Sequence, residues 1–223
     1  MSKDISKEIK VFSQEITPNV AILDVGCGLR PYGDFFSHTK YTGIDVEQSG
    51  RKLGDKKPDQ FFDGLNIPFE AFSFDVVICT QVLEHCLDPR KLLSEIHRVL
   101  KPAGKLFLTV PFIWGEHEMP YDFRRYSSYG IKKEVENSGF TIIKQEKLTK
   151  GIRVIEILVN SEINNYKFTI KNGSAYFGLL DFVSRKLWKL VLRIWQKIYK
   201  FDRVYLDNLI VAVKINIPKR DTN

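Results

Sequence analysis

Short apolar runs alternate along the chain with longer segments in which apolar residues recur at helical spacing. Six of the runs have the length and apolar content of buried strands: 21–25, 41–46, 74–80, 105–110, 140–148 and 208–215. Because helical segments separate most of these runs, the pattern predicts an α/β protein with a mostly parallel, doubly wound sheet.

Three segments outside these runs have an apolar face at helical spacing. The first is Lys3–Ile16, where Ile5, Ile9, Phe12 and Ile16 share one face. The second begins at Pro89 and ends at Lys101-Pro102, because proline is tolerated in a first helical turn and stops a helix elsewhere. The third covers 128–138, before Gly139.

Residues 151–203 are expected to be mainly helical, and a strand follows them. The chain shows no internal repeat and no low-complexity linker. The interpretation is therefore a single domain over residues 1–223. Its core comprises about 18–148 and the final strand 204–216, and a helical insertion at about 151–203 precedes that strand.

The composition is that of a globular protein, with 43% hydrophobic and 27% charged residues, and it excludes a disordered chain. The net charge of +7 is unevenly distributed. Residues 1–150 hold 21 basic and 21 acidic residues, whereas residues 151–223 hold 13 and 6. A positive segment beside a neutral one indicates a local anionic partner such as lipid headgroups or nucleic acid.

Cys27, Cys79 and Cys86 are too few, and odd in number, for a disulfide framework, and no CxxC pair suggests zinc. The first ten residues lack the apolar stretch of a secretory signal, and no apolar run approaches the roughly 20 residues of a membrane span. These features predict a cytoplasmic protein.

A glycine loop and two acidic residues lie at the ends of the first two predicted strands, where open α/β sheets bind ligands. Asp24-Val25-Gly26-Cys27-Gly28 ends the first strand, and Asp45 lies 17 residues beyond Gly28. Pro31 replaces the third glycine of a dinucleotide fingerprint, and Asp24 would repel phosphate but suits a cationic amino group. The Asp45 carboxylate can accept hydrogen bonds from both hydroxyl groups of a ribose. The pattern favours an adenosine ligand with a positively charged tail, and the alternative for the DxGxG motif alone is a tight turn.

Four stretches carry a family resemblance: LDVGCGLRPYGDFF, YTGIDV, DGLNIPFEAFSFDVVICTQVLEH and EIHRVLKPAGKLFLTVP. In order and spacing they resemble the class I S-adenosylmethionine-dependent methyltransferases, in particular the type 11 group, over about residues 21–145. The pair GCGxxPY and HExPYDxxRYS is similar to a subgroup of small bacterial methyltransferases associated with cell-surface glycan synthesis. The resemblance implies a Rossmann-like seven-stranded sheet and S-adenosyl-L-methionine as cofactor. Ala103 departs from the family's usual KPGG without affecting a catalytic position.

The resemblance also implies a set of cofactor-binding residues. They are Asp24, Gly26, Cys27, Gly28, Asp45, Val46, Asp63, Gly64, Thr80 and Gln81. The glycine loop would line the methionine part, with Asp24 at its amino group. Asp45 would hold the ribose and Asp63 would face the adenine amine. Thr80 and Gln81 would close over the methionine with their backbone carbonyls.

The segment 116–126 follows strand 105–110 and is crowded with histidine, acidic, arginine and tyrosine residues. His117 is the candidate general base, because a histidine side chain titrates near neutrality. The alternative is a hydrogen-bonded lid of His117, Asp122 and Arg125 that shapes the pocket, with Arg125 able to grip an anionic substrate group. The expected substrate or lid residues are His85, Tyr121, Asp122, Arg125 and Tyr126. No ligand spacing along the chain indicates a metal, and none is expected.

Residues 176–201 hold six basic residues and one acidic residue, and as a helix they would present an apolar arc of about 200° that includes Trp188 and Trp195. A helix that packs on one sheet face needs an arc of little more than about 100°. The wide arc and cationic face favour a helix in an anionic membrane interface. The alternative is a helix buried against a partner subunit or another helix. Nucleic acid is the weakest candidate, because the tryptophans lie on the apolar arc.

The combined prediction is a methyltransferase that O-methylates a sugar hydroxyl of a lipid-linked or cell-surface glycan, peripheral to the inner membrane face. One alternative is a methyltransferase of a quinone or another lipid-soluble small molecule. An alternative of another class is a cofactor-binding regulatory or partner module without turnover. The sequence leaves the oligomeric state open.

Overall fold

The structure is a computed structural model that describes residues 3–50, 52, 54, 57–169, 191, 194 and 203–215. The chain divides into two compact units. The first, here the sheet unit, comprises Met1–Phe112, Glu116–Leu148 and Asp207–Asn223. The second comprises Ile113–Gly115 and Thr149–Leu206.

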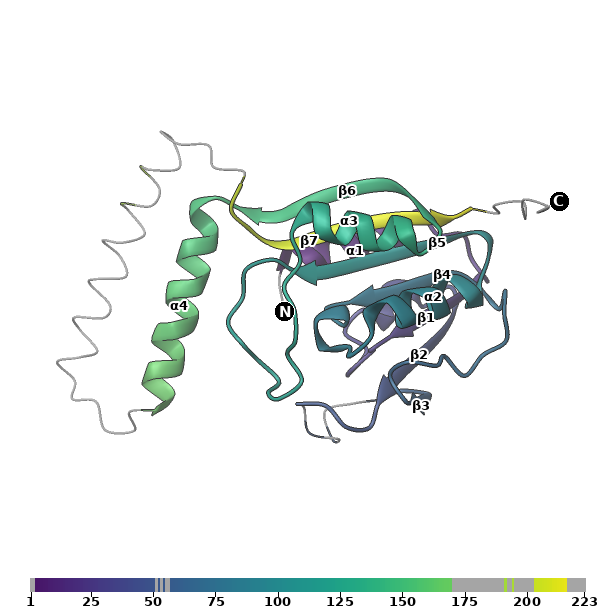
Figure 1. Ribbon diagram of the computed structural model, residues 1–223, viewed down its shortest axis with the longest axis horizontal. Coiled ribbons are helices and arrows are strands. Elements are labelled where there is room, and N and C mark those ends of the chain that lie inside the picture. The colour runs from purple at the N-terminus through teal and green to yellow at the C-terminus, as the bar shows by residue number, and fades with distance from the viewer. Residues whose placement is uncertain are drawn as a thin grey trace. The chain divides into compact units, whose positions relative to one another are not determined.

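A seven-stranded sheet forms the centre of the sheet unit, in the order β3-β2-β1-β4-β5-β7-β6 (Figure 1). The strands are β1 (Ala21–Val25), β2 (Lys40–Val46), β3 (Gln60–Phe62), β4 (Phe74–Thr80), β5 (Leu100–Pro111), β6 (Phe140–Lys150) and β7 (Tyr205–Lys214). The strands from β3 to β5 pair in parallel, and β7 pairs antiparallel with β5. The order reverses between β1 and β4, so the carboxyl ends of these two strands flank a topological switch point, where such sheets bind ligands.

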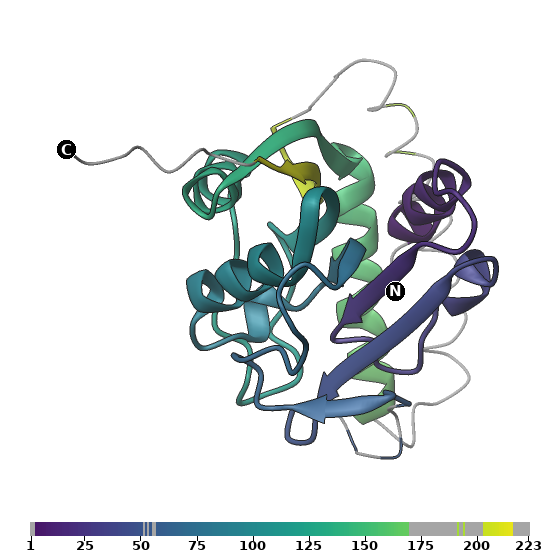
Figure 2. The ribbon, with the colours of Figure 1, turned by 90° about the vertical axis from the view of Figure 1, so that its right-hand side faces the viewer.

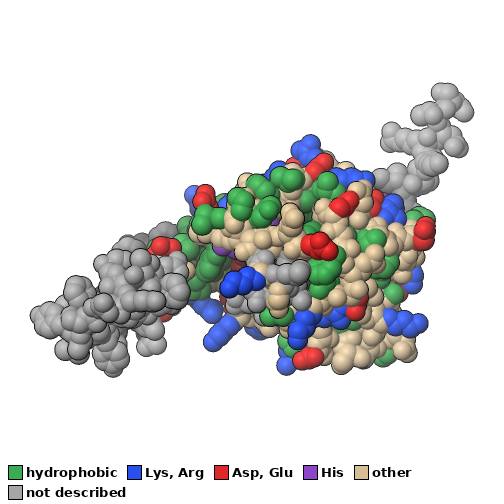
Figure 3. All heavy atoms as spheres, turned by 90° about the horizontal axis from the view of Figure 1, so that it is seen from below, with side chains coloured by type: hydrophobic (Ala, Val, Ile, Leu, Met, Phe, Trp, Pro, Cys, Tyr) green, Lys and Arg blue, Asp and Glu red, His purple; other side chains and the backbone are tan. Residues whose placement is uncertain are grey.

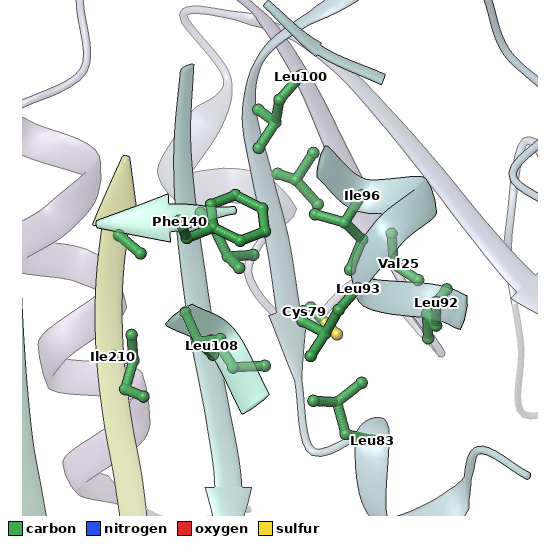
Figure 4. Packing of buried hydrophobic residues seen from close by; sticks show 14 of the residues in the cluster. Val25, Cys79, Leu83, Leu92, Leu93, Ile96, Leu100, Leu108, Phe140 and Ile210 are labelled. Carbon is green, nitrogen blue, oxygen red and sulfur yellow. The ribbon is translucent and has the colours of Figure 1, made fainter. Parts of the chain in front are cut away.

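Helices cover both faces of this sheet (Figure 2). They are α1 (Lys3–Gln14), α2 (Pro89–Val99) and α3 (Ser128–Asn137), with 3-10 turns η1 (Gly33–Phe36) and η3 (Leu83–His85). Successive strand residues point to opposite faces, which gives two cores. One core packs α2 residues such as Leu92 and Ile96 against strand residues such as Leu108 (Figure 4), and α3 contributes Ile131 and Val135 to the same cluster. The other packs α1 and η1 against residues such as Ile78 and Phe107.

Local sequence determines where two of these helices begin. The Asp88 side chain accepts a hydrogen bond from Lys91 N at 3.0 Å, and Pro89 occupies the first position of α2. The Ser127 Oγ accepts from Gly130 N at 3.1 Å at the start of α3. Both side chains satisfy a backbone donor that the first helical turn leaves without an intrahelical partner.

The α/β fold class and the seven-stranded Rossmann-like sheet are confirmed, and all six strands located from the apolar runs are present. The short β3 was not located, because two adjacent phenylalanines in a mostly exposed three-residue segment are too few to indicate a strand. The prediction that Lys101-Pro102 ends a helix was wrong in detail. The helix ends at Val99, and Lys101-Pro102 lies in β5, where Leu100 pairs with Phe74 ahead of a register shift.

The second unit contains α4 (Ile152–Thr169), in the first part of the predicted helical insertion. Residues 176–201, the predicted membrane-interface helix, lie outside the described residues except for positions 191 and 194. Among the described helices, none has the length and apolar character needed to cross a membrane. On the face of the molecule in Figure 3, basic and acidic side chains are interspersed, in keeping with the balanced charge of residues 1–150.

Candidate functional site

The glycine loop follows β1 at the switch point and has the left-handed backbone that glycine permits. Gly26 and Gly28 have φ angles of 71° and 52°. A Cβ atom at Gly26 would lie 2.4 Å from a methyl carbon of Val82, so only glycine fits there. Gly26 N and Cys27 N both donate to the carbonyl of Ile44, at 2.8 and 3.0 Å. The loop is therefore held against the end of β2 by its own amides.

Two buried carboxylates flank this loop, from the adjacent strands β1 and β2. Asp45 accepts hydrogen bonds from Gly28 N at 2.8 Å and from Val46 N at 2.7 Å. Asp24 is 1% exposed and accepts from the Tyr41 hydroxyl, and its Oδ1 has no hydrogen-bond partner among the described residues. Burial raises the pKa of Asp24 to about 7, against the lowering effect of Tyr41. A buried carboxylate oxygen without a partner is a place for a cationic or hydrogen-bonding ligand group.

The structure gives Asp63 and Gly64 a turn of their own. Both carboxylate oxygens of Asp63 accept hydrogen bonds from Asn66, and Oδ1 also accepts from Leu65 N. The Asn66 hydrogen bonds lower the pKa of this exposed side chain. Gly64, at a φ of 83°, completes the turn beside Val46. The predicted contact of Asp63 with adenine stays a prediction.

Thr80 and Gln81 end β4 beside the glycine loop. Gln81 has a φ of 56°, and both its backbone and its side chain donate to Thr109, at 2.9 and 3.2 Å. The Thr80 side chain hydrogen-bonds to the hydroxyl of Tyr32. These contacts fix the turn that leads to Val82, the residue in contact with Gly26.

The segment 116–126 is fastened to the turn after β4 by backbone and arginine contacts. Phe123 N donates to the carbonyl of Glu84 at 2.9 Å. Arg124 donates to the carbonyls of Cys86 and Leu87. On its other side, a Cβ at Gly50 would lie 2.0 Å from the Glu118 carbonyl oxygen, so the segment also contacts the chain that follows β2. The segment thus contacts the turns after two parallel strands that border the loop.

His117, Asp122 and Arg125 form a hydrogen-bonded group. Arg125 donates to both carboxylate oxygens of Asp122, at 2.6 and 2.7 Å. Asp122 Oδ2 also accepts from the backbone N of His117 at 2.9 Å and lies 3.1 Å from its Nδ1. Chiefly through Arg125, the pKa of Asp122 falls to about 2. Because this carboxylate is ionised and can only accept, the neutral form of the His117 ring has its proton on Nδ1 and its lone pair on Nε2.

His85 lies against His117, with ring centroids 4.8 Å apart in a T-shaped arrangement. The Nδ1 of His85 is 2.7 Å from the carbonyl oxygen of Tyr121, which can only accept, so its Nε2 also carries the lone pair. Burial lowers the pKa of His85 and favours the neutral ring. Tyr121 therefore acts here through its backbone.

Tyr126 was predicted as a substrate or lid residue, and the structure places its ring in the main core. Its hydroxyl contacts the carbonyl of Leu83 at 3.5 Å, and its own carbonyl accepts from Asn208 at 2.7 Å. It anchors the end of segment 116–126.

Glu84, which sequence reasoning missed, is fully buried beside the two histidines. Its Oε1 lies 3.9 Å from Nε2 of His85. Neither of its carboxylate oxygens has a hydrogen-bond partner among the described residues. Burial is the largest cause that raises its pKa to about 8. The signal in the sequence was a charged residue directly before a histidine in the turn after an apolar strand.

Comparisons with known proteins agree on the family. Residues 23–108 match the model of a methyltransferase domain. An uncharacterised protein of Methanocaldococcus jannaschii is 33% identical over 151 residues, which is 63% of each chain. A ubiquinone biosynthesis O-methyltransferase of Coxiella burnetii is 30% identical over 118 residues, 45% of this chain and 48% of the relative.

Among solved structures, phosphoethanolamine N-methyltransferase 2 of Haemonchus contortus, in complex with S-adenosyl-L-methionine, has a TM-score of 0.57 at 22% identity. The likeness covers 93% of this chain and 52% of that one and shows a shared fold. The chain spans between 34% and 63% of the length of the curated relatives that it matches. Residues 23–108 therefore carry a type 11 methyltransferase domain, and the fold is one shared with S-adenosylmethionine-dependent methyltransferases.

Proposed function

We propose that the protein binds S-adenosyl-L-methionine at the glycine loop and transfers its methyl group to a hydroxyl acceptor that lies under segment 116–126. One observation carries the choice of cofactor. The amides of Gly26 and Cys27 donate to Ile44, and that of Gly28 donates to Asp45. A loop whose amides are already bonded offers no anion-binding nest, so a pyrophosphate gains little there.

The remaining groups fit a nucleoside with a cationic tail. The buried Asp24 Oδ1, which has no partner among the described side chains and backbone, suits the ammonium group of the methionine part. Asp45, at the end of β2, suits the two ribose hydroxyls. The left-handed backbone at Gly26 and Gly28 lets the ligand approach the loop closely.

Methyl transfer needs an acceptor in line with the methyl group and a destination for the acceptor's proton. The cofactor would supply a methyl group bound to a sulfonium sulfur. As the acceptor oxygen forms the new C–O bond, the S–C bond breaks and the sulfur is left as a neutral thioether. We propose that His117 takes the proton, because Asp122 orients the ring with its lone pair on Nε2. Arg125 holds Asp122 and fixes that orientation.

The proposed acceptor is a sugar hydroxyl of a lipid-linked or cell-surface glycan, and its support is the subgroup resemblance of the GCGxxPY and HExPYDxxRYS motifs. The proposed contact with the inner membrane face rests on the sequence of 176–201. A quinone or another lipid-soluble acceptor is the second candidate, favoured by the similarity to a ubiquinone biosynthesis O-methyltransferase. The third candidate is a cofactor-binding module without turnover.

Two measurements test the proposal. Calorimetry should show binding of S-adenosyl-L-methionine and much weaker binding of a nicotinamide dinucleotide, and the reverse preference would overturn the cofactor assignment. Labelled methyl transfer is then assayed into membrane lipid, quinone and soluble glycan fractions. Label in the glycan-bearing fractions supports the favoured acceptor, label in quinone supports the second candidate, and cofactor binding without transfer supports the third.

The pH dependence of cofactor affinity should report on Asp24. Because burial raises its pKa to about 7, the side chain is largely protonated at pH 6 and must release a proton when it binds an ammonium group. Affinity should therefore rise with pH and level off above 7, with binding at pH 6 about tenfold weaker than at pH 8. Calorimetry across this range measures the effect.

Two controls isolate the Asp24 effect. Adenosine lacks the ammonium group, so its affinity should change little over the same range. Asp24→Asn should bind the cofactor more weakly at pH 8 and lose the dependence. An unchanged pH profile in Asp24→Asn would show that another group causes it.

His117→Ala should lower turnover at saturating cofactor by about 10²- to 10⁴-fold, the usual contribution of a positioned proton acceptor. Cofactor affinity should stay close to that of the wild type, because His117 is in segment 116–126 and not in the glycine loop. Single-turnover kinetics with labelled cofactor measure the loss. Near-wild-type turnover would remove the base role and leave His117 as a lid residue.

A further inference from the structure

Glu84, His85 and His117 bring three metal-ligating side chains together from two segments of the chain. One ligand atom from each lies within 4.8 Å of the others. The expectation that the protein binds no metal rested on spacing along the chain. Spacing along the chain does not reveal ligands that come together only when segment 116–126 contacts the turn after β4.

We propose that Glu84, His85 and His117 bind one divalent transition metal ion. Two imidazoles and one carboxylate are a ligand set used for Zn²⁺ and for other first-row divalent ions, with open positions for water or substrate. The inference goes beyond the proposed function, since metal binding can be measured whether or not a methyl group is transferred.

The histidines are already held as metal ligands usually are. In metal sites, the ring nitrogen that does not bind the ion commonly donates to a carboxylate or a backbone carbonyl. His85 donates from Nδ1 to the Tyr121 carbonyl at 2.7 Å, and His117 from Nδ1 to Asp122 at 3.1 Å. Both rings are thereby fixed with the lone pair on Nε2.

Glu84 supplies the second observation. Its side chain is fully buried, and both of its oxygens lack a hydrogen-bond partner within the described part of the chain. A buried carboxylate without a partner is costly when ionised, and a bound cation would remove that cost. The nearby carboxylates of Asp122 and Asp207 oppose ionisation of Glu84, whereas Arg125 favours it. The two carboxylates would favour a bound cation, and Arg125 would oppose it.

The geometry needs only side-chain adjustment. Ligand atoms at about 2.1 Å from a tetrahedral ion lie about 3.4 Å apart. The Oε1 of Glu84 is 3.9 Å from Nε2 of His85, and the ligand atoms of the cluster lie up to 4.8 Å apart, so they must approach one another by about 0.5 to 1.4 Å. Rotation of the side chains can supply this, and the backbone contacts of segment 116–126 stay in place.

Metal binding and proton acceptance would use the same lone pair on His117. With an ion bound, His117 therefore acts as a ligand, and the base role proposed above applies to the metal-free protein. The three ligands include no residue of the glycine loop and neither of the two aspartates that flank it.

The test uses the full chain without a histidine tag, stripped with a chelator and titrated with Co²⁺ alone. One equivalent of Co²⁺ should bind, give visible d–d absorption and be displaced by Zn²⁺. Asp122 orients a ligand, and Asp122→Asn should weaken Co²⁺ binding by about 10- to 100-fold. Glu84 is itself a proposed ligand, so Glu84→Gln should weaken Co²⁺ binding by at least as much. His38→Gln removes a histidine outside the cluster and should bind like the wild type.

Circular dichroism and cofactor affinity verify that each variant is folded. If Glu84→Gln does not fold, His85→Gln takes its place. No stoichiometric Co²⁺ binding by the wild type, or equal binding by the wild type and the folded cluster variants, would overturn the site. Cofactor binding and methyl transfer are measured separately, so a failed metal site and a failed methyltransferase assignment give different results.

Discussion

Asp45→Ala is expected to weaken binding of S-adenosyl-L-methionine by about a hundredfold or more. Hydrogen bonds to a charged group contribute about 1.5–3 kcal/mol each, and the proposed contact with the ribose diol has two of them. Loss of about 3 kcal/mol corresponds to a factor of more than 100 in affinity. Isothermal titration calorimetry measures the change directly.

The same substitution also removes the partner of Gly28 N, so a second ligand is needed to separate ribose recognition from loop support. The wild type should bind S-adenosylhomocysteine much more tightly than its 2′,3′-dideoxyribose analogue. Asp45→Ala should bind the two alike, because the coupling between side chain and diol is lost. Asp34→Asn alters an exposed carboxylate in η1 and should retain the wild-type discrimination. If Asp45→Ala discriminates as the wild type does, Asp45 does not hold the ribose.

The apolar pattern located most of the sheet because buried parallel strands are continuous apolar runs, which need no knowledge of their partners. The strand β7 was found this way although it pairs antiparallel with β5. The three-residue β3 escaped because it is too short for a recognisable apolar run, although Phe62 packs against the core. The end of α2 was misplaced because a register shift lets Lys101-Pro102 join a strand.

The arrangement of the residues proposed to bind the cofactor could be predicted because they lie at strand ends, where the fold alone brings them together. Asp24 and Asp45 needed only the order of the first two strands to be placed as neighbours. The arrangement of Glu84, His85 and His117 could not be predicted, because it depends on the contact of segment 116–126 with the turn after β4. Glu84 has no distinguishing spacing, and only its burial without a partner separates it from an ordinary turn residue.

The contact between Gly26 and Val82 connects the two sides of the site. Val82 lies two residues before Glu84, and its carbonyl accepts from His85 N at 2.9 Å. A change at Gly26 therefore affects the turn that carries two of the proposed metal ligands, as well as the cofactor loop.

Gly26→Ala should lower the free energy of unfolding by about 2–5 kcal/mol. Holding a residue with a Cβ at the left-handed φ of 71° costs about 1–2 kcal/mol, and overpacking against Val82 adds about 1–3 kcal/mol. Val82→Ala in the same chain removes the methyl carbons that the new Cβ would meet, so it should relieve the overpacking and leave the backbone cost. Urea denaturation of the four proteins of this cycle gives the coupling energy, which we expect to be about 1–3 kcal/mol in favour of the double variant.

Gly54→Ala is the matched control, because a Cβ there meets nothing within 4 Å and should change stability little. If Gly26→Ala is as stable as the wild type, or if Val82→Ala restores none of the lost free energy of unfolding, then Gly26 and Val82 are not in the contact described.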